Sequence, residues 1–199
     1  MFNFSRRTKA ITAFVIVIVA GYAIARFWQS QNQIPEAFTG ARSQGAIIAE
    51  NIVSTSNEST AELQKINELD QEGDYKDALT LTNGLITQSE SLRNQAVQLS
   101  AQVQNMTQSL SSINNFDEQQ AALESIASQL ALINQLINYS GDLGHLSDVL
   151  QARFQGQPEP TGTVQGIVNQ INTDVNAINN FNTQATQAMA QFDKIVGQQ

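Results

Sequence analysis

A heptad repeat of apolar residues between positions 78 and 113 is the feature that most constrains the fold of this chain. Its positions recur at alternating steps of four and three residues, and nine of the eleven are apolar: Ala78, Thr82, Leu85, Ser89, Leu92, Ala96, Leu99, Val103, Met106, Leu110 and Ile113. A β-strand alternates with a period of two and cannot produce this pattern, whereas a helix packed against other helices does. The repeat therefore predicts one long helix over about residues 75–113.

Two further segments show helical spacing. The first predicts a helix over about residues 117–139, with a kink or break at Gly141 and Gly144 before it continues to about residue 155. Its seam is Leu123, Ile126, Leu130, Ile133, Ile137 and Ser140. A loop over residues 156–162 follows, and then a helix over about residues 162–196, whose seam is Val164, Val168, Ile171, Val175, Ile178, Asn182, Ala185, Met189, Phe192 and Val196.

The turn signals between these segments can also be assigned. Asp117 is the predicted N-cap of the helix that follows the first repeat, with Gln120 completing a capping box and Phe116 acting as a hydrophobic staple. Gly73 is predicted to end the preceding helix, and Asp74 to cap the next one. Such short connections make consecutive helices antiparallel neighbours.

The segment before residue 73 is less regular. Pro35 and Glu36 suit the first turn of a helix, but residues 54–60 include no apolar side chain. Either one helix continues through this polar waist, or it breaks near Ser56-Asn57. We therefore expect an all-α, elongated, antiparallel bundle of four helices, or of five if the break exists. Its predicted seam includes Leu85, Leu92, Leu99, Val103, Leu110, Leu123, Leu130, Ile137, Ile171, Ile178 and Phe192.

An apolar run over residues 10–25 carries no charged side chain and follows a basic flank. This arrangement predicts a single-pass membrane helix with a cytoplasmic N-terminus and an extracytoplasmic remainder. The residues assigned to the anchor and its flanks are Arg6, Arg7, Lys9, Phe14, Ile18, Tyr22, Phe27 and Trp28. The predicted domains are a basic tail over residues 1–9, the anchor over 10–29, a linker over 30–35 and the bundle over 36–199.

Signal cleavage is the alternative to an anchor. Ala23-Ile24-Ala25 fits the small-residue pattern that precedes a signal-peptidase cut, which would release a chain starting at Arg26. Tyr22, Phe27 and Trp28 instead group where aromatic rings favour the membrane boundary, which favours the uncleaved anchor.

Charge and composition exclude several function classes. The chain has 18 acidic and 10 basic residues and no cysteine, so nucleic-acid binding, disulfides, thiol chemistry and a lipoprotein anchor are not expected. The only histidine, His145, does not converge with Asp142 and Asp148 on one ion, because three-residue steps fan around a helix. The acidic cluster of residues 70–77 lacks the order of a calcium loop. We expect no catalytic residue, no cofactor and no metal.

The expected function is therefore that of a membrane-anchored interaction or scaffold module of the cell envelope. Its expected partners are membrane lipid, through the N-terminal helix, and an envelope protein or polymer; pairing of two bundles as a homo-oligomer is left open. An N-terminal membrane helix before a long bundle also resembles the periplasmic ligand-binding domain of chemoreceptors. That resemblance implies a sensory role, although the sequence as given shows no second membrane helix before Gln199. A secreted bundle cleaved after Ala25 is the third reading.

Overall fold

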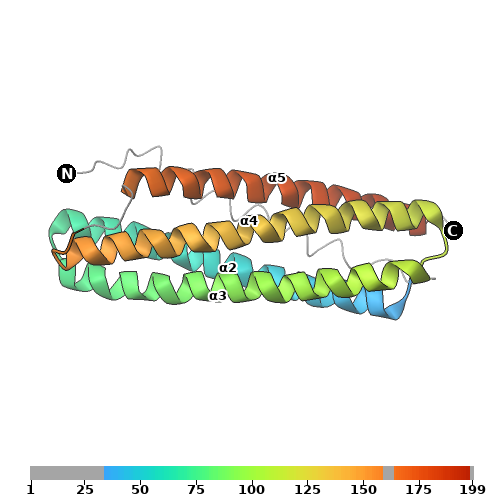
Figure 1. Cartoon of the computed structure of the whole chain (residues 1–199), viewed down its shortest axis with the longest axis horizontal. Coiled ribbons are helices and arrows are strands. Elements are labelled where there is room, and N and C mark those ends of the chain that lie inside the picture. The colour runs from blue at the N-terminus through green and yellow to red at the C-terminus, as the bar shows by residue number, and fades with distance from the viewer. Residues whose placement is uncertain (1–33, 159–163, 198–199) are drawn as a thin grey trace.

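Four long helices run side by side in alternating directions (Figure 1). The computed structural model describes residues 34–158 and 164–197. The helices are α2 (Glu36–Glu72), α3 (Tyr75–Ser109), α4 (Phe116–Phe154) and α5 (Val164–Val196), and a 3-10 turn, η1 (Leu110–Ser112), follows α3. The described ranges include no strand. An all-α antiparallel bundle is thereby confirmed for this part of the chain.

The anchor predicted over residues 10–29 lies outside the described residues, as do the eight residues assigned to it. Within residues 34–158 and 164–197, no helix combines the length and the hydropathy needed to cross a membrane.

The apolar repeat of α3 forms the centre of the bundle. Every one of its eleven positions is buried, from Ala78 at the start of the helix to Ile113 just after η1. Thr82 and Ser89, the two polar positions, donate hydrogen bonds to the carbonyl oxygens of Ala78 and Ile86 at 2.8 Å each. Because each hydroxyl bonds within its own helix, the stripe stays buried without an unmet donor.

Helix α2 is continuous through its polar waist, so the five-helix alternative is wrong. Ser56 and Ser59 take the core-facing positions there, and the Ser59 hydroxyl donates to the Thr55 carbonyl at 2.9 Å. Small polar side chains can replace apolar ones on a packed face when their hydroxyl groups donate hydrogen bonds to carbonyls of their own helix. The helix ends as predicted, because Gly73 has φ +79° and the Asp74 side chain accepts from the Asp77 amide.

The start of α4 differs from the prediction. Asn115, not Asp117, is the N-cap, and its side-chain oxygen accepts from the Asp117 amide at 2.9 Å. Phe116 is 74% exposed and forms no staple. Asparagine is as strong a cap as aspartate, so the helix begins at the earlier of two suitable residues.

The expected kink near Tyr139–Gly144 is also absent, since α4 continues to Phe154. Gly144 serves packing instead. A Cβ built there would lie 3.3 Å from the Ser89 Oγ, so the missing side chain lets α3 and α4 approach closely.

The predicted seam of α4 is partly wrong. Leu123 and Leu130 are 48% and 43% exposed, although Ile126 and Ile133 are buried. The face that packs into the bundle carries Ala121, Ala122, Ile126, Ile133, Leu136, Tyr139 and Leu143. Ile137 and Ile178 pack at the edge of the core, whereas Ile171 and Phe192 are buried within it. Apolar residues occupy more than one face of α4, and periodicity alone could not rank these faces.

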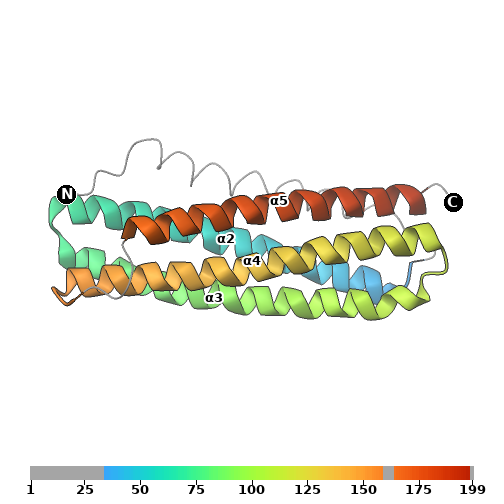
Figure 2. The same cartoon turned by 45° about the horizontal axis from the view of Figure 1, so that its top comes forward.

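The four helices do not close into a uniform ring. Helix α2 packs along α3, α3 along α4 and α4 along α5, but α2 and α5 hardly approach each other. The start of α2, the end of α5 and the connection from α3 to α4 lie at the same end of the bundle (Figures 1 and 2). There the rings of Phe38 and Phe192 lie 5.4 Å apart and Arg42 pairs with Asp193 at 2.7 Å. The backbones of α2 and α5 otherwise make few close approaches.

The opposite end is held in a similar way. Arg153 of α4 pairs with Asp70 of α2 at 2.9 Å, and the rings of Tyr75 and Phe154 stack with centroids 5.9 Å apart. Each end of the bundle thus combines one arginine–aspartate pair with one aromatic pair.

The register of α4 can be tested by two substitutions one helical turn apart. Ile133→Asp places an unpaired charge at a position that is 3% exposed, and should cost about 3–5 kcal/mol of unfolding free energy. Leu130→Asp at the exposed position should change it by less than about 1 kcal/mol. Urea unfolding followed by circular dichroism measures both, and equal losses would contradict the observed register.

Candidate functional site

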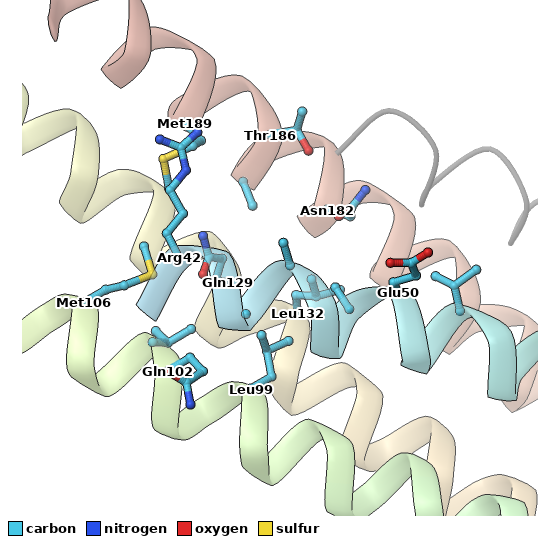
Figure 3. A pocket seen from close by; sticks show the side chains of 16 residues that line it. Arg42, Glu50, Leu99, Gln102, Met106, Gln129, Leu132, Asn182, Thr186 and Met189 are labelled. Carbon is cyan, nitrogen blue, oxygen red and sulfur yellow. The ribbon is translucent and has the colours of Figure 1, made fainter. Parts of the chain in front are cut away.

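A small, mainly apolar hollow between the helices is the first candidate site. A cavity of about 100 Å³ lies between all four helices and is partly open to solvent (Figure 3). Its walls are mainly apolar, with Leu99, Val103, Met106 and Leu132 among them. Three of the α2 residues that line it have small side chains, namely Gly45, Ala46 and Ala49, and they leave space that larger residues would fill. A Cβ at Gly45 would already lie 3.5 Å from Leu99, so α2 itself is close to α3.

Polar groups surround this apolar interior. Arg42 gathers with Met106 and Met189 at one end of the cavity, and Glu50 lies toward the other (Figure 3). Asn182 and Thr186 come from the α5 side. Asn182, predicted as the one polar intruder in its seam, is therefore a wall residue of the cavity. A cavity that holds drug-sized ligands usually measures about 300–1,000 Å³. This one has room for only a few non-hydrogen atoms.

A second site lies between α4 and α5 around Asp174. This side chain is only 1% exposed, and its Oδ1 accepts hydrogen bonds from the Nε2 of Gln135 at 2.5 Å and of Gln170 at 3.2 Å. Its Oδ2 has no hydrogen-bond partner in the described structure. Asp142 and Tyr139 of α4 are its titratable neighbours.

The protonation of this group is shifted by its surroundings. Burial, and then the nearby carboxyl of Asp142, raise the pKa of Asp174 to about 6, against the opposing effect of the two glutamine amides. Burial, together with the charge of Asp174, raises the pKa of Tyr139 to about 12. Tyr139 therefore stays neutral, while Asp174 is the carboxyl that changes charge near neutral pH.

The acidic cluster of residues 70–77 is taken up by structural contacts. Asp70 pairs with Arg153 and Asp74 caps α3, whereas Glu72 and Asp77 are exposed. Across the described residues, no group of histidine, cysteine or acidic side chains is arranged to hold a metal ion.

Sequence reasoning missed Asp174. The available signal was its position, because Ile171, Val175 and Ile178 surround it at helical spacing on the apolar face. A carboxylate at such a position must be buried or displaced to an edge, and the neighbouring helix decides which. The small residues of α2 gave no signal, since alanine and glycine suit both a tight contact and a hollow.

Replacing Asp174 by asparagine should stabilise the protein at neutral pH. The pKa of Asp174 is higher in the folded chain than in the unfolded chain. Its protonated form therefore stabilises the fold fully at a pH below the pKa of the unfolded chain, and this contribution is lost as the pH rises through about 6. At pH 7 Asp174→Asn should therefore raise the unfolding free energy by about 2 kcal/mol, and this gain should vanish near pH 4. Urea melts across this pH range, with the exposed Asp148→Asn as control, measure it; a gain independent of pH would contradict the assignment.

Filling the cavity should also stabilise the bundle. Ala49→Leu adds three carbon atoms next to a hollow of about 100 Å³ and should raise the unfolding free energy by roughly 1–2 kcal/mol. Ala101→Leu on the exposed face of α3 makes the same change without a cavity to fill and should have little effect. Thermal melts compare the two, and a loss of stability in Ala49→Leu would show that the space cannot accept a side chain.

Comparison with known proteins gives no functional lead: no protein-family model, no curated protein and no solved structure matches this chain. Its function is therefore inferred from its own residues and geometry.

Proposed function

We propose that this chain is a membrane-tethered, extracytoplasmic helical bundle that works as an interaction or scaffold module of the cell envelope. The observation that carries the proposal is the uncharged apolar run of residues 10–25 behind Arg6, Arg7 and Lys9. Cationic flanks of this kind are retained in the cytoplasm, which would leave the bundle on the other side. The linker over residues 30–35 then connects the anchor to the start of α2.

The shape and charge of the bundle support a role in contact rather than in chemistry. Its helices have 33 to 39 residues, so they extend for roughly 50–58 Å at 1.5 Å per residue. From residue 36 onward the chain has six basic and 18 acidic residues, which gives a formal charge near −12. Such a surface suits solubility and contact with basic or neutral partners, and disfavours anionic polymers.

A ligand-sensing role is less well supported. The resemblance to chemoreceptor domains concerns architecture alone, and the cavity beside α2 is smaller than a usual ligand site. A secreted bundle would differ from the tethered one by a cleaved peptide bond, since cleavage after Ala25 would give a mature chain beginning at Arg26. The intact mass of the protein extracted from cells separates these two cases.

The tether can be tested by charging the apolar run. Val17→Arg together with Ile18→Arg places two charges at the centre of the proposed span, each costing about 2.5–3.5 kcal/mol of insertion free energy. The full chain should then move from the membrane fraction to the soluble fraction, whereas Gln31→Arg with Gln33→Arg in the linker should leave it membrane-bound. Fractionation and vesicle flotation measure the distribution. Equal flotation of both variants would refute the tether.

The interaction role needs a separate experiment. Affinity capture with the full chain from envelope extracts should retain a defined protein or polymer. A variant that combines Ile133→Asp with Leu92→Asp places two unpaired charges in the core and should be unfolded, so it is the control for contacts that need no folded bundle. Repeated failure of the folded chain to retain any component beyond that control would count against the proposal.

A further inference from the structure

The outer face of α4 carries a second heptad repeat that the bundle does not bury. Counting in steps of four and three, the α4 outer stripe is Phe116, Gln120, Leu123, Ala127, Leu130, Asn134, Ile137 and Gly141. Seven of these eight residues are exposed, and Ile137 is half-buried. Phe116, Leu123 and Leu130 account for three of the large exposed apolar side chains in the described residues.

The stripe keeps one orientation along the helix. A straight α-helix drifts by about 20° per heptad against a strict seven-residue repeat, but seven of the eight stripe residues stay exposed between Phe116 and Gly141. The inner face of α4 is buried against its neighbours through residues such as Ala122, Ile126 and Ile133. The α4 outer stripe therefore stays on the side away from the core for about seven turns.

The order of residues within the stripe has the form of a two-stranded coiled coil. Every seventh residue is large and apolar (Phe116, Leu123, Leu130, Ile137), whereas the intervening positions are small or polar (Gln120, Ala127, Asn134, Gly141). Leucine at the d position favours two strands, and a single asparagine at an a position fixes register and strand number. This order predicts a helical partner with the same repeat.

We propose that the α4 outer stripe packs, in parallel, against the same stripe of a second copy of this chain. The parallel direction rests on the proposed function, since two bundles tethered to one membrane through the same N-terminal segment must point the same way. In that arrangement Leu123 and Leu130 meet their counterparts, and the two Asn134 side chains face each other within the seam.

Charge favours a second copy despite the acidity of the chain. No charged side chain occurs in residues 125–141, so most of the stripe faces its counterpart without repulsion. Glu124 flanks the stripe at an e position, and the partner's residue at the matching g position would be Gln119, which is uncharged. The closest acidic residues thus do not oppose each other.

The size of the stripe predicts a weak dimer in free solution. Eight residues per copy are fewer than the roughly 20–30 per partner of a standard stable interface. A common membrane raises the effective concentration of the two copies, so the pairing would form there at protein levels too low for it in solution.

The absence of cysteine allows a direct test on the full chain. Gln120→Cys, Ala127→Cys and Asn134→Cys are each made alone at exposed stripe positions, and the purified proteins are treated in mild detergent, at high and low protein concentration, with a short thiol-specific cross-linker. A parallel pair should give a cross-linked dimer with all three variants, in amounts that fall on dilution. Ile47→Cys, at an exposed apolar position on α2, is the matched control and should give none.

The pattern of cross-links decides between the outcomes. Cross-linking of Ala127→Cys alone would mean antiparallel stripes and would overturn the proposed arrangement. No cross-link at the highest concentration, or equal cross-linking of Ile47→Cys, would overturn the second copy as the partner. So would a cross-link only to a different protein when the same variants are treated in cell membranes. Vesicle flotation of the same variants, reconstituted without detergent, reports the tether separately, so a dimer without flotation, or flotation without a dimer, identifies which proposal has failed.

A disrupting variant adds a second readout. Leu123→Glu combined with Leu130→Glu, in the Ala127→Cys background, changes exposed residues and should leave the thermal melt nearly unchanged. The cross-linked fraction should nevertheless fall about tenfold or more. An undiminished fraction in this folded variant would contradict the role of the stripe.

Discussion

Burial of one heptad stripe along α3 is the constraint on which the rest of the bundle depends. Helix α3 packs along α2 on one side and along α4 on the other, and its apolar repeat is buried from end to end. With no cysteine in the chain, side-chain packing of this kind, rather than cross-links, holds the helices together. Helix α5 reaches the assembly chiefly through α4, so the α2–α5 seam is the least constrained part of the bundle.

The hollow lies where the backbones of α2 and α5 stay apart. The ends are held by arginine–aspartate and aromatic pairs, Arg42 with Asp193 and Phe38 with Phe192 at one end, but small residues of α2 face α5 behind that closure. Alanine and glycine cannot fill the space, and a packing defect of this size lowers stability. The outer face of α4 is the opposite case, because large side chains are exposed there and none of the described helices covers them.

Polar residues in the core fall into two groups with different consequences. The hydroxyls of Thr82, Ser89 and Ser59 bond to carbonyls of their own helix, so they cost little wherever they are buried. Asp174 has no such internal solution and depends on Gln135 of α4 as well as Gln170 of its own helix. Thr82 and Ser89 could be placed from the sequence by their positions in the repeat, whereas Ser59 lies in the waist of α2 that the sequence left open. The Asp174 site could not be placed in this way, because it exists only once α4 and α5 are side by side.

The sequence by itself determined the helical class, the number of bundle helices to within one, the turn at Gly73-Asp74 and the buried face of α3. These follow from local chemistry: periodicity, a glycine with positive φ and an aspartate cap. Only the tertiary structure decided which face of α4 turns inward, whether the waist of α2 and the glycines of α4 break their helices, and where the bundle stays open. Those choices depend on what the neighbouring helices offer, since a leucine stripe is buried only where another surface covers it.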